Sequence, residues 1–210
     1  FTGVNPEKIT VTLESADELP KGNEPVDELI GKKFIMYIGR PTPHKNLRRL
    51  IDAFALLQKK YPDLTLALAG KKDSNYVRHE TYVNEHGIKN VVFTGFISDE
   101  QLRWMYENTA VYCFPSLSEG FGLPGLEAML HGAPVASSTA TCLPETHGDA
   151  AYYFDPFSVE DIAKSIDDIL SDDKLRNELI KKGKKHVKTF SWQRMAEQTL
   201  AVYERYGRKS

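Results

Sequence analysis

Two glutamates with a glycine-rich stretch between them are the residues of this chain best suited to chemistry. Glu119 and Glu127 enclose the sequence Gly120-Phe-Gly-Leu-Pro-Gly125. Glycines ahead of a helix let backbone N–H groups approach an anion closely, and the helix N-terminus adds partial positive charge. The two carboxylates can then accept hydrogen bonds from hydroxyl groups on either side of that anion. The stretch therefore favours a phosphate flanked by two polyols, as in a nucleotide sugar.

The same stretch also has the spacing G-x-G-x-x-G, which is typical of dinucleotide sites. Such a fingerprint usually follows the first strand of its unit by a tight turn, and an acid about twenty residues later binds a ribose. Here the residues 115–119 separate the apolar run from Gly120, and the next apolar run ends at Ser138 without an acid. Glu145 has the right separation from Gly125 but falls in an expected loop. A dinucleotide site is the less favoured alternative.

A second candidate loop is Gly39-Arg-Pro-Thr-Pro-His-Lys-Asn46, which contains Arg40 and Lys45. The planar fork of arginine and the point charge of lysine both suit a diphosphate. Gly39 lets the backbone turn away from a strand, and Asn46 is expected to cap the helix that follows. Taken alone, these residues also fit two surface cations and a helix cap. Their position at the end of a predicted strand favours binding.

The elements that must position these loops alternate between short apolar runs and helical patterns. Strand character is found at 34–38, 64–69, 91–93, 111–114, 134–136 and 151–154, with a further short strand expected at 9–13. A helix with Leu47, Leu50, Ile51, Phe54 and Leu57 on one face is expected to end before Pro62. Further helices are expected at about 75–86, 99–108, 123–132, 158–170, 173–188 and 192–206. This order predicts an α/β fold with a doubly wound parallel sheet, Rossmann-like, whose ligands bind beyond the carboxyl ends of the strands.

The domain organisation follows from the same pattern. Residues 1–31 are expected to be a leading segment and interdomain linker, 32–190 the Rossmann-like nucleotide-sugar-binding domain, and 191–210 a C-terminal helix at a domain junction. Because the chain begins with Phe1 rather than methionine, it is expected to be a fragment.

Composition excludes several other classes. A net charge of −2 gives no bulk electrostatic reason for binding nucleic acid or membrane. The two cysteines match no metal spacing and are expected to be inert thiols in a reducing compartment. The six histidines are scattered, so no metal site is expected. The sequence lacks the G-x-S-x-G motif that would indicate a serine hydrolase.

With these motifs in order, the chain resembles the C-terminal, donor-binding half of the retaining glycosyltransferases of family four (glycosyl transferases group 1), which have the GT-B fold. The resemblance extends from about residue 9 to 206. The matching pieces are Gly39-Arg40 with Lys45-Asn46, Phe93-Thr-Gly-Phe-Ile-Ser-Asp99, Phe114-Pro-Ser-Leu-Ser-Glu119 through Glu127-Ala128, Gly132-Ala-Pro-Val-Ala-Ser137, Leu143-Pro-Glu145, and Gly148-Asp-Ala-Ala151 with Asp155-Pro156. The chain departs from the family at Glu14-Ser15, where an Asn-Gly pair is usual.

The resemblance implies a role for each matching residue. Arg40 and Lys45 would hold the donor diphosphate, and Glu119 would bind hydroxyls of the donor sugar; these three are the catalytic candidates. Glu127 would bind the ribose. The donor-binding set is Gly39, Ile97, Asp99, Ser118, Phe121, Gly122, Leu123 and Glu127, with Ile97 and Asp99 near the base. Neither a metal nor a cofactor is expected, because cationic side chains and a helix dipole stabilise the leaving diphosphate in this family.

The resemblance also implies an activity. The expected function is transfer of a sugar, with retention, to a glycan or lipid-linked acceptor in polysaccharide or lipopolysaccharide assembly. GDP-mannose is the preferred donor, with UDP-glucose, UDP-GlcNAc and dTDP-rhamnose as alternatives. The acceptor would bind through a missing N-terminal domain, without which the fragment is expected to be inactive. The enzyme is expected in the cytoplasm, with peripheral membrane attachment of the full-length protein as an option. A non-catalytic nucleotide-binding module, an epimerase and an NAD-binding oxidoreductase remain as alternatives.

Overall fold

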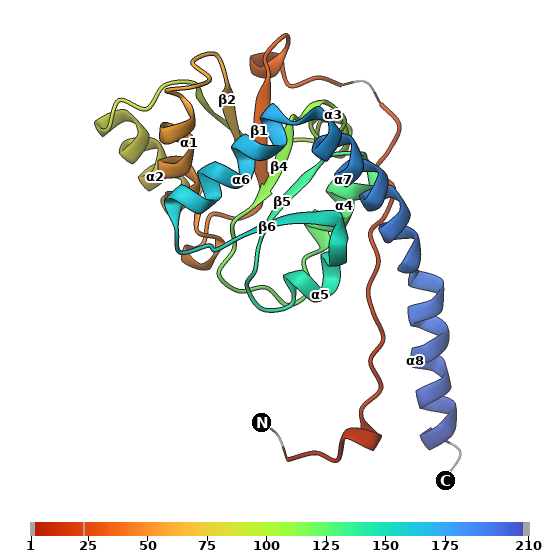
Figure 1. Ribbon diagram of the computed structural model, residues 1–210. Helices are drawn as coiled ribbons and strands as arrows, with labels where there is room; N and C mark the ends of the chain where they lie inside the picture. The colour runs from red at the N-terminus through yellow and green to blue at the C-terminus, as the bar shows by residue number, and fades with distance from the viewer. Residues whose placement is uncertain (1–2, 23, 208–210) are drawn as a thin grey trace.

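The computed structural model describes residues 3–22 and 24–207. Within them, six parallel strands form one sheet in the order β3-β2-β1-β4-β5-β6 (Figure 1). The strands are β1 Phe34–Ile38, β2 Thr65–Ala69, β3 Val91–Gly95, β4 Val111–Phe114, β5 Val135–Ser138 and β6 Ala151–Phe154. This order is that of a doubly wound Rossmann sheet, so the predicted fold class is confirmed.

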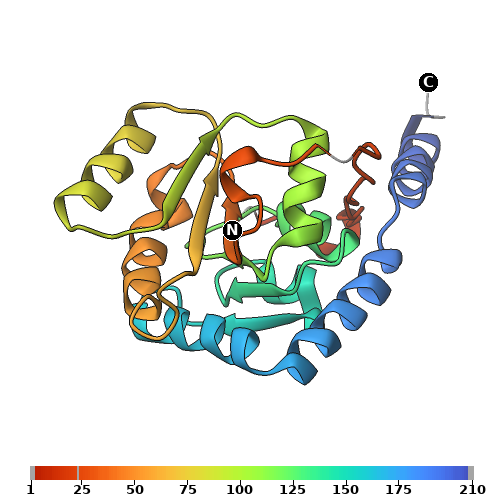
Figure 2. The ribbon, with the colours of Figure 1, turned by 90° about the horizontal axis from the view of Figure 1, so that it is seen from above.

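Helices cover both faces of the sheet (Figure 2). Successive side chains of a strand point to opposite faces. Accordingly, Ile35 and Tyr37 of β1 belong to one buried cluster, whereas Phe34 and Met36 belong to another. The first cluster is covered by α1 Leu47–Leu57, α2 Ser74–Glu85 and α6 Val159–Ser171. The second is covered by α3 Asp99–Asn108, α4 Leu123–Leu130 and α5 Leu143–His147.

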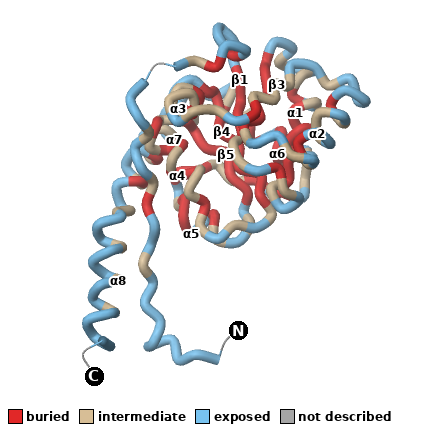
Figure 3. The backbone as a smooth tube through the Cα atoms, turned by 180° about the vertical axis from the view of Figure 1, so that it is seen from behind, coloured by how far each residue is buried: buried red, intermediate tan, exposed pale blue. Residues whose placement is uncertain are grey.

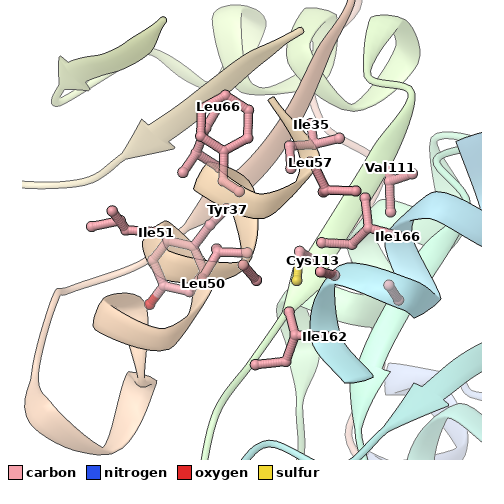
Figure 4. Packing of buried hydrophobic residues seen from close by; sticks show 14 of the residues in the cluster. Ile35, Tyr37, Leu50, Ile51, Leu57, Leu66, Val111, Cys113, Ile162 and Ile166 are labelled. Carbon is pink, nitrogen blue, oxygen red and sulfur yellow. The ribbon is translucent and has the colours of Figure 1, made fainter. Parts of the chain in front are cut away.

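The first cluster shows why the sequence forms these helices. In α1 the apolar residues recur every three or four positions, and Leu50 and Ile51 are fully buried on the face toward the sheet. In α6, Ile162 and Ile166 are also fully buried, and they meet α1 over Cys113 of β4 (Figure 4). Each such side chain contributes roughly 1.5–3 kcal/mol through removal of apolar surface from water.

Two local predictions are wrong. Residues 9–13 form no strand: the segment is extended, and Ile9 and Val11 are 56% and 68% exposed. Its alternating pattern predicts an extended backbone, but no strand of the described sheet pairs with it. The region 137–147, expected to be a loop, contains the helix α5. Five residues span too few turns to show a helical period.

The two ends of the described chain leave the main body together. After α7 Asp173–His186, the helix α8 Trp192–Gly207 projects from the domain and has no buried residue (Figure 3). Val11 and Leu13 line a hollow with Phe190 and Arg194 at the start of that helix. The assignments of 1–31 to a linker and 191–210 to a domain junction remain predictions, and residues 1, 2, 23 and 208–210 lie outside the described residues. No helix in the described part of the chain is long and apolar enough to cross a membrane.

Candidate functional site

The crevice between β1 and β4 is the natural ligand position in this fold. β1 is followed by α1 on one face of the sheet and β4 by α4 on the other. Because the two connections leave in opposite directions, the loops after these adjacent strands separate and open a cleft at the carboxyl edge. Both candidate loops of the sequence, 39–46 and 115–122, lie at this point.

An ion pair joins the two loops. The Nζ atom of Lys45 lies 2.6 Å from Oε1 of Glu119, although the residues are 74 positions apart in sequence. The side chains are only 20% and 12% exposed, so water screens the pair weakly. A hydrogen bond between two charged groups at this distance is among the stronger polar contacts in proteins. The structure therefore brings together two of the three residues predicted to be catalytic.

Asn46 links the two loops through its side chain. Its Nδ2 group donates to the carbonyl oxygens of Pro115 at 3.0 Å and Pro156 at 2.8 Å, and it is buried. A backbone bond from Leu117 N–H to the His44 carbonyl, 2.7 Å long, reinforces the connection. The predicted helix cap is wrong: Asn46 precedes α1 with a left-handed backbone, φ +60°, and its side chain makes no capping bond. Asparagine tolerates this conformation better than most residues.

Thr141 holds the backbone of Glu119 through two hydrogen bonds. Its Oγ1 accepts the Glu119 N–H at 3.0 Å and donates to the Glu119 carbonyl at 3.2 Å. Thr141 has φ +50°, which is costly for a β-branched residue and is retained only where the surroundings impose it. The Sγ of Cys142 donates to the same carbonyl at 3.3 Å. Sequence reasoning missed this support, because neither a positive φ nor a contact across 22 residues leaves a local signal.

Arg40, in the same loop as Lys45, faces the loops that follow β2 and β3. It lines a hollow of about 350 Å³ together with Gly39, Ile97 and Asp99, so four predicted residues meet there. The Arg40 Nε atom is 3.2 Å from Oδ2 of Asp73, and its side chain is 75% exposed. Hydrogen bonds lower the pKa of the Asp73 carboxyl, first from the Tyr76 N–H at the start of α2 and then from Arg40.

The glycine turn leads directly into α4. Gly122 is the residue before the helix, and its φ of +102° is one that side-chain-bearing residues rarely adopt. Pro124 stands in the first turn, where its missing N–H costs nothing. Phe121 is half-buried and packs edge-on against Phe190, with ring centres 5.8 Å apart. The unpaired N–H groups of this turn are suited to an anion.

Glu127 lies in the second turn of α4 and is half-buried. Burial raises the pKa of its carboxyl, and the negative charges of Asp17 and Asp99 raise it further. The hydroxyl of Tyr106 donates to Oε2 at 3.3 Å and opposes that shift. Glu127 is therefore a carboxylate held partly out of water with few donors, as a group that binds hydroxyls would be.

The comparisons with known proteins decide the family. Residues 22–186 match the family described as Glycosyl transferases group 1. The chain belongs to this family. It is 34% identical over 183 residues to O-antigen chain mannosyltransferase B of Escherichia coli, covering 84% of this chain and 47% of the relative. It is 33% identical over 207 residues to MMP alpha-(1->4)-mannosyltransferase of Mycolicibacterium hassiacum, covering 96% and 49%. The chain thus spans about half the length of these curated relatives.

Solved structures of glycosyltransferases share the fold. Sucrose-phosphate synthase of Thermosynechococcus elongatus superposes with a TM-score of 0.77 at 29% identity, covering 86% of this chain and 47% of that one. The C-terminal domain of a glycosyl transferase group 1 protein of Francisella tularensis has a TM-score of 0.68 at 31% identity, covering 78% and 88%. The described chain is accordingly one Rossmann-like half of a GT-B glycosyltransferase fold.

Within this glycosyltransferase domain the predicted residues fall into neighbouring groups rather than one cluster. Lys45 and Glu119 touch, whereas Arg40 pairs with Asp73 instead. Ser118 is exposed. Among the described residues, no group of three or more His, Cys, Asp or Glu is placed to hold a metal ion.

Proposed function

We propose that this chain is the donor-binding half of a retaining hexosyltransferase, which transfers a sugar from a nucleotide sugar to a saccharide acceptor. The observation that carries the proposal is the Lys45–Glu119 pair. It stands in the cleft between β1 and β4, beside the glycine turn that opens α4. A cation for phosphate, a carboxylate for hydroxyls and a helix N-terminus are thus neighbours in one cleft. These are the groups that a sugar diphosphate requires.

The reaction places negative charge on the leaving diphosphate. Lys45, Arg40 and the N-terminus of α4 are oriented before the reaction and stabilise this charge as it develops. Glu119 accepts hydrogen bonds from the sugar and holds the anomeric carbon in place. Glu127 takes the ribose hydroxyls, and the hollow beside Ile97 takes the base. No metal or cofactor is part of this proposal.

GDP-mannose is the donor that we propose first. The support is that the two curated relatives above are named as mannosyltransferases. A UDP-sugar is the alternative, since a structural neighbour from Anabaena, 22% identical, was solved with UDP and glucose. Backbone contacts to a base leave little trace in side chains, so both bases are included in the test.

Transfer is proposed to require a further, acceptor-binding domain. The curated relatives are about twice as long as the region that this chain matches. Adding the preceding part of the parent protein is expected to restore transfer to a lipid-linked or free glycan. Equal turnover by the 210-residue chain alone would contradict this.

Calorimetric titration tests the binding proposal. GDP or UDP should bind, NAD should not, and ADP should bind more weakly than the preferred diphosphate. Arg40→Ala and Glu127→Ala should each weaken binding by about tenfold or more, because each removes hydrogen bonds to a charged group. Lys60→Ala, which breaks an exposed pair with Asp167 far from the cleft, is the control. Tight NAD binding without diphosphate binding, or unchanged affinity in both cleft variants, would overturn the proposal.

A further inference from the structure

His147 is a buried histidine beneath the glycine turn that no role assigned above uses. It is the last residue of α5, and none of its surface is exposed. Its Nε2 atom lies 3.1 Å from the carbonyl oxygen of Gly122, and its Nδ1 atom lies 3.3 Å from Oγ of Ser137 on β5. A carbonyl can only accept, so Nε2 carries the proton and Nδ1 is left as an acceptor facing the Ser137 hydroxyl, which also lies 3.3 Å from the Ser138 carbonyl. The ring is a neutral bridge between the sheet and the turn.

Two glycines of the turn are shaped to this ring. A Cβ built on Gly125 would overlap the His147 ring, and one on Gly122 would lie 2.7 Å from Cδ2 of Leu143 and 3.2 Å from Nε2 of His147. At Gly120, in contrast, an added Cβ would meet nothing within 4 Å. Contact with His147 inside the protein therefore accounts for the glycine at 125, and the positive φ of Gly122 together with the contacts to Leu143 and His147 accounts for the glycine at 122. Close approach of a phosphate is not needed to account for them.

The hydrogen bond to Gly122 fixes the direction of one ligand-facing group. A peptide unit is rigid and planar, so its carbonyl and the N–H of the next residue point in opposite directions. The Gly122 carbonyl accepts both from His147 and from the Gly125 N–H at 3.0 Å. With the carbonyl held toward the interior by two donors, the Leu123 N–H is held outward at the open end of α4. Gly122 alone, being a glycine, would allow this peptide to rotate more freely than any other residue would.

We propose that His147 is a positioning residue for the donor site, which through its Nε2–H locks the Gly122–Leu123 peptide so that the N–H groups opening α4 face the diphosphate. This inference rests on the proposed function for its effect on binding. The lock itself is a property of the protein.

The surroundings of His147 keep its ring neutral, which fits a role in orienting the Gly122–Leu123 peptide rather than in supplying charge. Burial lowers the pKa of His147 to about 4, and the nearby His186 lowers it as well, while Glu119 opposes the shift. The ring is neutral at neutral pH and adds no charge to the cleft. His186 in turn contacts the Thr146 carbonyl through its Nε2 at 2.8 Å, so α7 holds α5 in place behind the ring.

The test compares His147→Phe with His147→Gln. Phenylalanine keeps a flat ring of similar size without an N–H, whereas glutamine keeps an N–H donor with poorer packing. Positioning predicts that the phenylalanine variant binds GDP or UDP about tenfold more weakly and that glutamine recovers part of the loss. A purely space-filling role predicts the opposite order. His86→Phe, at the exposed end of α2, is the matched control and should bind as the wild type does.

Gly125→Ala perturbs the same contact from the other side. Its added methyl group must displace the ring, although alanine is by itself the better helix former. Weaker diphosphate binding is expected here too. If His147→Phe does not fold, this variant decides the question; wild-type affinity in Gly125→Ala would then overturn the inference.

Hydrogen exchange separates failure of the lock from failure of the proposed function. Without nucleotide, amides in 118–126 of the phenylalanine variant should exchange about tenfold faster than in the wild type, with β2 unchanged as an internal reference. Unchanged exchange in 118–126 would overturn the inference, as would unchanged affinity in a variant that exchanges faster. If the wild type binds none of GDP, UDP or ADP, the proposed function fails, and exchange alone decides whether His147 holds the turn.

Discussion

The ammonium nitrogen of Lys45 lies 2.6 Å from a carboxylate oxygen of Glu119, and this contact joins the loops after β1 and β4. Each group compensates the charge of the other in a place where water screens poorly. A diphosphate that binds Lys45 must either share the ammonium group with Glu119 or displace the Glu119 carboxylate from it. A sugar hydroxyl can then take up the carboxylate. Binding at the proposed donor site is therefore expected to be coupled to rearrangement of this pair.

Breaking the pair should destabilise the protein. We expect Lys45→Met to lower the free energy of unfolding by about 1–3 kcal/mol, because it leaves the mostly buried Glu119 carboxylate without its partner. Lys60→Met, which breaks a pair whose lysine is 56% exposed, should lower the free energy of unfolding less, because water screens that pair. Urea unfolding followed by circular dichroism measures both. Equal losses would show that burial does not strengthen the cleft pair.

Neutralising Glu119 should separate diphosphate binding from sugar recognition. In Glu119→Gln, Lys45 is released and a negative charge leaves the cleft, so GDP or UDP should bind about threefold tighter or more. The additional affinity of the sugar-bearing donor over the bare diphosphate should disappear, since the carboxylate no longer accepts from the sugar. Calorimetry with each pair of ligands measures both changes. Weaker diphosphate binding would mean that Glu119 positions Lys45 rather than competing for it.

The buried Glu127 carboxylate should lower the stability of the folded protein at neutral pH. Burial raises the pKa of its carboxyl, so the folded state holds the proton more tightly than the unfolded state does. Stability from this group is then present at low pH and lost as the pH rises through the raised pKa. We expect Glu127→Gln to unfold at higher urea than the wild type at pH 7, with a smaller gain near pH 5.

The same variant should bind diphosphate nucleotides about tenfold more weakly, because an amide is a poorer acceptor than a carboxylate for ribose hydroxyls. Glu85→Gln, at the exposed end of α2, is the control and should change neither stability nor affinity. A loss of stability in Glu127→Gln at pH 7 would contradict the assigned cost of burying this carboxylate.

His147 should make the fold sensitive to acid. Its pKa is lowered to about 4 in the folded protein, so between the ordinary value and 4 the unfolded state binds more protons. Stability should therefore fall as the pH drops below about 6.5, by up to roughly 1.4 kcal/mol per pH unit. His186 and Glu119 are the titratable neighbours that act on this ring.

Thermal melts from pH 4.5 to 7.5 measure the effect. His147→Phe should lose less stability over this range than the wild type, so the two curves should approach each other in acid. Parallel curves would mean that protonation of other groups causes the acid sensitivity.

Local patterns were sufficient for most of the architecture. β1 has the predicted bounds and α1 contains the predicted apolar face, because a five-residue apolar run covered on both faces and an apolar stripe of helical period both leave clear signals. The strand predicted at 9–13 was wrong because alternation of apolar and polar residues indicates only that a segment is extended. Whether such a segment joins a sheet depends on edges formed by distant residues. Helix α5 was missed because its five residues carry no period.

By itself, the sequence determined the kinds of groups available for binding and the loops that carry them. Glu119, Arg40 and Lys45 lie in loops that follow strands at the edge where ligands bind, and Glu127 lies in the second turn of the next helix. The sequence places them there because local patterns show the order of the elements along the chain. Only the tertiary structure decided which of these residues contact one another. It paired Lys45 with Glu119 across 74 residues, sent Arg40 to Asp73, and placed His147 under the glycine turn. These contacts depend on the order of strands in the sheet and on the packing of helices against it, which no short stretch of sequence contains.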